Sequence, residues 1–137
     1  MFSPRFIVLL VLMLQFNGMS SQELTEFKWK KRILLIIDTN NDLPVRDLQV
    51  GKFISRHEEM EERDLVLFVC MGKEVLDIDG LKTNVDPQKI SYGEFQGVVL
   101  IGKDGGVKLR KKFFVEPNEI FQLIDQMPMR RSEMKNR

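Results

Sequence analysis

The sequence contains a single cysteine, Cys70, and a single histidine, His57, among 137 residues. One cysteine cannot form an intramolecular disulfide, and this pair cannot supply a four-ligand zinc site without several carboxylates. Neither charge is in clear excess, because 21 Lys and Arg face 20 Asp and Glu. A nearly neutral chain has no overall field to attract nucleic acid or an anionic membrane. We therefore expect no metal, no cofactor and no nucleic-acid partner, and a fold stabilised by apolar burial.

The first twenty residues differ from the rest of the chain. Arg5 precedes the mostly apolar run Phe6–Phe16, which has about half of the ~20 residues needed to span a bilayer. Gly18 and Ser20 place small residues before a cut after residue 20. The pattern predicts a signal peptide over residues 1–20, export to a periplasm or out of the cell, and no stable membrane span after removal. An uncleaved membrane anchor and a buried first helix are the alternatives.

The whole chain is 43% hydrophobic and 30% charged, a composition typical of one globular domain. Ile33–Ile37 and Leu65–Cys70 are continuous apolar runs of the kind found in buried strands. Between them, helical spacing predicts a helix over residues 48–62, capped by Asp47, with His57 partly buried. Such a helix forms a right-handed crossover, so the two strands should be parallel.

The second half predicts, in order, a polar loop, a short helix, two strands and a closing helix: residues 71–85, 87–92, 98–101, 107–110 and 117–126. The glycine-rich turn at residues 102–106 predicts an antiparallel hairpin. The closing helix should place Ile120, Phe121 and Ile124 on its inner face, and Pro128 should stop it. We expect one domain over residues 23–129, followed by a basic polar tail at residues 130–137.

This order of elements resembles the thioredoxin fold, with a four-stranded mixed central sheet. Four strings make the resemblance more specific: WKKRILL (29–35), ERDLV (62–66), VLIGKDGGVKLR (99–110) and LIDQMPMRRSEM (123–134). They are similar to the thioredoxin-like domain of unknown function 4174, over about residues 27–134. That family occurs as exported stand-alone bacterial proteins and is similar to modules of extracellular-matrix and sushi-repeat-containing proteins. The resemblance implies a fold and a compartment, since the family has no established activity.

Thiol chemistry in this fold needs a thiolate at the start of the helix after the first strand, where the helix end lowers its pKa. Residues 38–49 contain no cysteine, and the place of the usual cis-proline falls near Gly97. The leading hypothesis is therefore a non-catalytic module with a protein-binding or structural role. The alternative is a thiol oxidoreductase or peroxidase-like enzyme acting through Cys70, which otherwise is a core residue. A small-ligand site beside residues 38–42 is a third hypothesis.

Aromatic, methionine and arginine side chains near the two ends suggest a docking surface for a partner. The candidates are Trp29, Met129, Arg130 and Arg131. Trp29 could instead anchor in the core, and the arginines could stabilise the carboxyl end of the closing helix. The expected partner is an unidentified protein or another extracellular or periplasmic macromolecule, and self-association remains an alternative.

Overall fold

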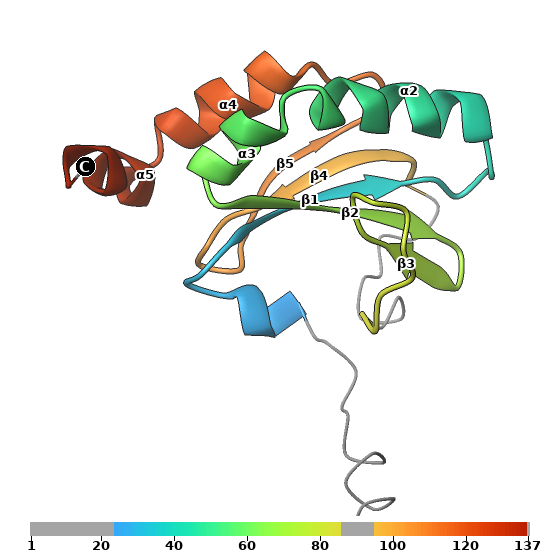
Figure 1. Cartoon of the computed structure of the whole chain (residues 1–137), viewed down its shortest axis with the longest axis horizontal. Helices are drawn as coiled ribbons and strands as arrows, with labels where there is room; N and C mark the ends of the chain where they lie inside the picture. The colour runs from blue at the N-terminus through green and yellow to red at the C-terminus, as the bar shows by residue number, and fades with distance from the viewer. Residues whose placement is uncertain (1–23, 86–94, 137) are drawn as a thin grey trace, which may run out of the picture.

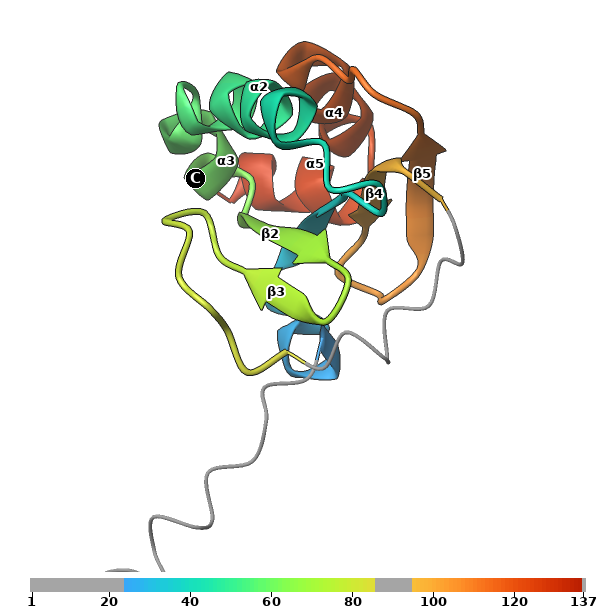
Figure 2. The same cartoon turned by 90° about the vertical axis from the view of Figure 1, so that its right-hand side faces the viewer.

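The computed structural model describes residues 24–85 and 95–136, which form a mixed α/β fold (Figure 1). Its elements are η1 (Leu24–Phe27), β1 (Arg32–Ile37), α2 (Leu43–Ile54), α3 (His57–Glu62), β2 (Leu65–Met71), β3 (Glu74–Leu76), β4 (Gly97–Ile101), β5 (Val107–Lys111), α4 (Pro117–Asp125) and α5 (Pro128–Lys135). Helices α2, α3 and α4 cover one face of the sheet, η1 lies beneath the other face, and α5 lies at one end (Figure 1 and Figure 2).

Within the described residues the sheet has the strand order β3-β2-β1-β4-β5. β1 and β2 are parallel, from Arg32 opposite Leu65 to Ile37 opposite Cys70. The other neighbouring strands are antiparallel. The parallel pair and the β4–β5 hairpin predicted from the sequence are confirmed.

The sheet has five strands rather than the predicted four, because part of the expected polar loop forms β3. Gly72 has a φ of +57°, a left-handed conformation that glycine adopts without steric cost and that allows a tight turn after β2. The turn places Val75 opposite Cys70, where Val75 is buried. A strand of three residues is too short to show a periodic pattern, so β3 could not be predicted from residue alternation.

The crossover helix begins five residues earlier than predicted and is split in two. Asp42, not Asp47, caps α2: its side chain accepts a hydrogen bond from the Val45 N–H at 3.4 Å, and Pro44 lies in the first turn. α2 ends before Ser55, and α3 starts at His57. Because the break turns the chain, His57 is exposed rather than partly buried.

The cap gives a prediction with an internal control. Replacing Asp42 by alanine should lower the free energy of unfolding by about 1 kcal/mol, because an N–H in the first turn of α2 loses its acceptor. Asp47→Ala should change it by less than about 0.5 kcal/mol, since Asp47 is exposed within the helix. Urea unfolding of both variants measures the difference. Equal losses would contradict the assignment of the cap.

Two apolar layers lie on the two faces of the sheet, because side chains alternate along each strand. Leu34 and Ile36 of β1 pack on the helix side with Phe53, and with Ile120, Phe121 and Ile124 of α4 as predicted. Ile33, Leu35 and Ile37 pack on the opposite side, where Phe27 of η1 meets Phe68 edge to face at 5.6 Å. β1 is thus buried on both faces, as its unbroken apolar run predicts.

The C-terminal segment expected as a polar tail is largely helical. Pro128 lies in the first turn of α5, so it begins a new helix as well as following the end of α4. Proline suits this position because the first N–H groups of a helix have no partner within it. The predicted signal peptide and the predicted helix at residues 87–92 lie outside the described residues. In the described ranges, no helix has the length and apolarity needed to cross a membrane.

Candidate functional site

The start of α2, where thioredoxin-type chemistry would need a thiol, holds a buried ion pair. Asp38 follows β1 directly and is 2% exposed. Its Oδ2 atom lies 2.8 Å from an Arg46 guanidinium nitrogen, and its Oδ1 atom accepts a hydrogen bond from the Asp42 N–H at 3.1 Å. The position is therefore filled by a carboxylate already paired with a cation, which is not a nucleophile poised to react.

Gly97, near which the sequence comparison with the thioredoxin fold placed a cis-proline, has no room for any side chain. A Cβ atom there would collide with the Lys111 carbonyl oxygen and lie 2.9 Å from the Lys112 Cα atom. Both are backbone atoms, at the end of β5 and in the residue after it, and backbone cannot turn aside as a side chain can. Glycine therefore serves the close approach of two backbones at this position.

Cys70 is buried in β2 and is 8% exposed. It packs in the layer beneath the sheet with Ile37 and Val75. Burial raises the pKa of its thiol to about 12. Since the thiolate is the reactive form, only about one molecule in 10⁵ would carry it at pH 7.

The reactivity of Cys70 can be measured directly. In the native protein at pH 7, alkylation by iodoacetamide should be at least about 100-fold slower than in urea-unfolded protein, because burial suppresses both access and ionisation. Mass spectrometry of timed samples gives both rates. Rapid labelling of folded protein would reinstate Cys70 as a catalytic candidate.

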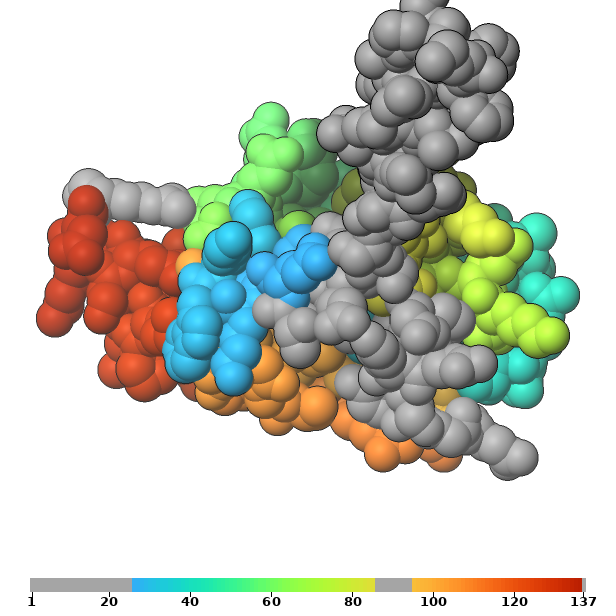
Figure 3. Space-filling model, turned by 90° about the horizontal axis from the view of Figure 1, so that it is seen from below, coloured from blue at the N-terminus to red at the C-terminus, as the bar shows by residue number. Residues whose placement is uncertain are grey.

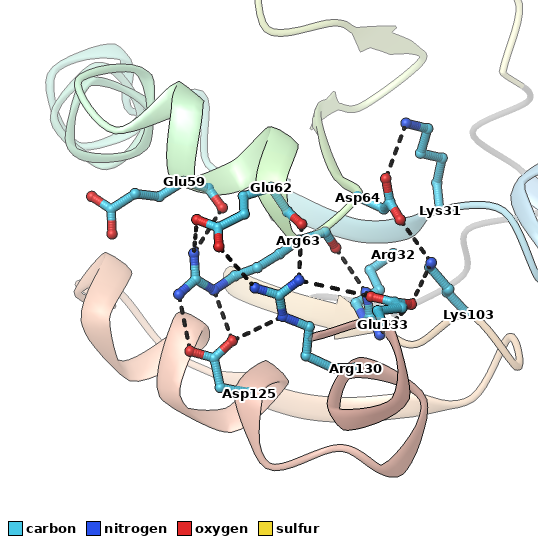
Figure 4. Close-up of polar contacts among 10 residues, drawn as sticks. All are labelled: Lys31, Arg32, Glu59, Glu62, Arg63, Asp64, Lys103, Asp125, Arg130 and Glu133. Atoms are coloured by element: carbon cyan, nitrogen blue, oxygen red, sulfur yellow. Dashed lines mark hydrogen bonds and ion pairs between the residues drawn. The ribbon is translucent and has the colours of Figure 1, made fainter. Parts of the chain in front are cut away.

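Charged side chains gather at the opposite end of the sheet, near α5, in an arrangement we call the ionic cluster (Figure 4). Its members are Lys31, Arg32, Glu59, Glu62, Arg63, Asp64, Lys103, Asp125, Arg130 and Glu133. They come from the start of β1, from α3 and the turn after it, from the β4–β5 turn, and from α4 and α5. Cations and carboxylates are equal in number, so the cluster is neutral overall.

Arg130 is the centre of one half of the cluster and is 1% exposed. Its Nε atom donates to Asp125 at 3.1 Å, and its terminal nitrogens donate to the Glu62 carbonyl at 2.9 Å and the Glu62 carboxylate at 3.3 Å. Asp125 also receives two hydrogen bonds from Arg63, at 3.0 and 2.9 Å. The Arg63 guanidinium lies 4.7 Å above the Phe121 ring. This half fixes α5 and α4 to the end of α3.

Arg32, also 1% exposed, is the centre of the other half. Its two terminal nitrogens each lie 3.2 Å from a Glu133 carboxylate oxygen, and one also donates to the Arg63 carbonyl at 2.8 Å. Lys103 bridges Glu133 at 2.6 Å and Asp64 at 2.8 Å. Glu133 therefore ties α5 to β1 and to the β4–β5 turn at once.

The cluster favours the ionised forms of Glu133 and Asp125. Burial acts to raise the pKa of Glu133, but hydrogen bonds from Lys103 and Arg32, with their charges, outweigh it and hold that pKa below its ordinary value. The pKa of Asp125 is lowered against burial in the same way by Arg63 and Arg130. Neither carboxyl group is held protonated near neutral pH, as a general acid would be. The arrangement is suited to holding α5 in place.

A cavity of about 320 Å³ opens beside the cluster, between the β4–β5 turn and the start of α5. Its walls combine the cations Arg32, Lys103 and Lys108 with apolar side chains that include Met127 and Met129. The Nε atom of Arg32 is buried and has no acceptor among the described residues. A buried donor without a partner costs about 1–3 kcal/mol. The lysine ammonium groups and methionine side chains that line the cavity suit a ligand group with an oxygen acceptor and a short apolar stem.

The predicted docking residues divide into two groups in the structure. Trp29 is 59% exposed and Met129 is 40% exposed, and Arg131 is exposed as well. The backbone N–H of Trp29 donates to the carbonyl of Lys103 at 2.6 Å. Trp29 therefore lies next to the cavity, which both Lys103 and Met129 line. Arg130 is instead buried, and it pairs with the Asp125 side chain and with Glu62 rather than with carbonyl groups of α4. In space-filling view, the start of the described chain adjoins α5 and the hairpin (Figure 3).

Sequence reasoning missed the ionic cluster, although a signal for it was present. Every member except Glu59 lies in one of the four strings that carry the family resemblance. Each string places charged residues beside apolar ones that form strands or helices. Their convergence is a tertiary property, because Arg32 and Glu133 are 101 positions apart in the chain.

Comparison with known proteins gives a family match over most of the chain. The model of Domain of unknown function (DUF4174) matches residues 23–133. Among curated proteins, none matches the chain. The matched range contains the whole ionic cluster as well as the start of α2.

Proposed function

This chain belongs to the DUF4174 family, and we propose that it is an exported, non-catalytic module of thioredoxin-like fold that binds another protein. The binding surface, the docking face, consists of Trp29, Met129, Arg131 and the cavity beside the ionic cluster. The observation that carries the proposal is the Asp38–Arg46 ion pair at the start of α2. A fold whose reactive position is filled in this way keeps its scaffold without its usual chemistry.

The thioredoxin-like fold is supported by the order of the elements. A parallel strand pair joined by helices precedes an antiparallel hairpin and a closing helix, and β1 is central. The extra strand β3 adds to one edge without changing this order. Export is supported by the basic and apolar pattern of residues 1–20.

Trp29 supports the docking face because its ring is mostly exposed, with the Lys28 ammonium 5.6 Å from the ring centroid. Its φ of +69° lies in the left-handed region, which costs a residue other than glycine about 1 kcal/mol. Because its ring is mostly exposed, the free energy of burying the ring does not offset that strain. A strained backbone together with an exposed aromatic side chain is typical of a contact residue.

The non-catalytic part of the proposal is tested by disulfide turnover. The purified protein, supplied with insulin and dithiothreitol, should reduce insulin no faster than dithiothreitol alone, because no thiolate lies at the start of α2. The Cys70→Ser variant serves as the matched control. Turnover by the wild type that disappears in this variant would refute the proposal and establish the oxidoreductase alternative.

The docking face is tested by Trp29→Gly, a change that removes the ring and suits the backbone. We expect the free energy of unfolding to stay equal or to rise by up to about 1 kcal/mol, because the left-handed strain is relieved. Captures from the exported fraction of the source cells, analysed by mass spectrometry, should lose the partner with this bait. Lys30→Ala, an adjacent exposed position, should retain it. A partner held equally by wild type and Trp29→Gly would refute this docking face.

A further inference from the structure

We propose that the free edge of β2, residues 65–68, accepts an extended peptide of apolar and basic residues as an added strand. This site lies on a different edge of the molecule from the docking face, and its observations are independent of that proposal. Three features support it: the direction of the β2 backbone groups, the early end of the β2–β3 pairing, and a groove with an acidic rim.

The first feature is the backbone of Leu65 and Leu67. The Arg32 N–H donates to the Asp64 carbonyl at 2.7 Å, and the Asp38 N–H donates to the Cys70 carbonyl at 3.0 Å. Even-numbered residues of β2 therefore direct their backbone groups toward β1. Since successive residues of a strand direct these groups to opposite edges, Leu65 and Leu67 direct theirs away from β1.

The second feature is the early end of the pairing between β2 and β3. The ladder runs from Met71–Glu74 to Val69–Leu76, and the next hydrogen-bonded pair in that register would be Leu67 with Ile78. That pair does not form. Among the described strands, none therefore pairs with the Leu65–Phe68 part of this edge.

Asp77 is the residue that ends the pairing. Its carboxylate accepts hydrogen bonds from the N–H groups of Asp79 at 2.9 Å and Leu81 at 3.0 Å, and its own N–H donates to the Leu81 carbonyl at 2.9 Å. These contacts turn the chain back on itself, so that Lys82 pairs with Leu76 on the far side of β3. These hydrogen bonds lie within the turn, so the turn forms without hydrogen bonds to β2.

The third feature is a groove of about 700 Å³ along this edge. Residues 65–68 line it with little exposed surface of their own, and Ile54, which is 42% exposed, adds apolar surface at the end of α2. An added strand would thus meet both backbone partners and apolar side chains, the combination used when a peptide extends a sheet. Unpaired strand edges are in general sites where another chain can add.

Charge on the groove specifies the occupant. Glu61, Asp77 and Asp79 line it, and no lysine or arginine does so among its described lining residues. An extended peptide that alternates apolar and basic residues matches both the floor and the rim. The outer edge strand β5 of a second copy has such a pattern, but its Lys108 and Lys111 are already paired with Asp104 and Glu119. We therefore assign the site to a partner peptide.

The probe is a capped hexapeptide of alternating valine and lysine, titrated into the purified protein and followed by amide NMR. On binding, the amides of Leu65 and Leu67 should exchange with solvent at least about tenfold more slowly, because each N–H gains an acceptor. The amides of Val66 and Phe68, which face β1, should change little. A peptide of the same length with prolines replacing two valines should not bind, since proline cannot donate along a ladder.

Paired variants locate the site. Ile54→Asp and Glu61→Lys should each weaken binding of the hexapeptide by about tenfold, through lost apolar contact and reversed charge respectively. The matched controls are Leu48→Asp and Asp47→Lys, at exposed positions of α2 outside the groove, and these should bind as wild type does. Urea unfolding confirms that all four variants are folded. Trp29→Gly should also leave hexapeptide binding unchanged.

Four results would overturn the proposal. They are no binding at millimolar peptide, equal binding of the proline peptide, slowed exchange on β5 instead of at Leu65 and Leu67, and slowed exchange at these two amides on raising protein concentration without peptide. The last result would assign the edge to a second copy. None of them bears on Trp29, so failure here and failure of the docking face are distinguishable.

Discussion

Replacing Arg130 by alanine should lower the free energy of unfolding by about 3 kcal/mol, as expected when one member of a buried ion pair is removed. Arg130 is almost completely buried, and its guanidinium satisfies Asp125, the Glu62 carbonyl and the Glu62 carboxylate. Both carboxylates retain some exposure to water, which places the expected loss at the lower end of the range for buried pairs. Urea unfolding at pH 7 measures the change.

The adjacent residue provides the control. Arg131 is exposed, and Arg131→Ala should change stability by less than about 0.5 kcal/mol. The two substitutions remove the same side chain from neighbouring positions of α5, so their difference isolates the buried contacts. Equal, small effects would mean that the Arg130 side chain is not held in the ionic cluster in solution.

Acid should unfold the protein through the same cluster. The pKa values of Asp64, Asp125 and Glu133 in the folded state lie below their ordinary values of 3.8, 3.8 and 4.5, because cations that include Lys103, Arg63 and Arg32 outweigh the effect of burial. As the pH falls, the unfolded chain therefore takes up protons before the folded chain does. The stability that these groups contribute is fully present above pH 4.5 and is lost as the pH falls through the lowered folded values.

Urea midpoints measured from pH 7 down to pH 3 test this pH dependence. The midpoint should be flat from pH 7 to about pH 5 and should fall steeply below about pH 4. Lys103→Met should give a shallower fall, because Asp64 and Glu133 each lose a bond that lowers their pKa. Lys112→Met, at an exposed position, should keep the steepness of the wild type. If the urea midpoint fell equally steeply with pH in all three proteins, groups other than those bound by Lys103 would cause the acid sensitivity.

The ionic cluster also bears on the proposed docking face. Lys103 connects the two, because its carbonyl accepts the Trp29 N–H while its ammonium holds Glu133 of α5. Met129 lies in the first turn of α5, whose position the cluster fixes. A surface built on two chain ends needs such an anchor to present a single shape to a partner. The structural role of Arg130 and the proposed binding role of its neighbours therefore belong to one arrangement.

Local patterns in the sequence were sufficient for the central elements. The apolar runs of β1 and β2 predict strands buried on both faces, and the helical segment between them predicts that they are parallel. The glycine-rich turn predicts the hairpin, and Ile120, Phe121 and Ile124 predict the inner face of α4. In each case the signal and the structure it specifies lie within about forty neighbouring residues.

Local sequence patterns did not predict the elements whose formation depends on distant segments of the chain. The start of α2 depended on whether Asp42 or Asp47 acts as the cap, two residues of equal capping propensity. β3 forms because β2 offers an edge for three residues, and the polar α5 forms because charges on β1, α3 and the β4–β5 turn neutralise those on its inner side. Composition alone predicted a polar loop at residues 71–85 and a polar tail at residues 130–137.

The sequence by itself determined that the chain has no thiol at the start of the helix after β1, because that absence is a matter of residue identity alone. It determined the central strands for a similar reason, since apolar burial follows local pattern. Only the tertiary structure decided that Arg130 is internal while Trp29 is exposed, and that part of β2 remains unpaired. Exposure and pairing depend on what lies across space, and residues 101 positions apart meet only after the chain has folded.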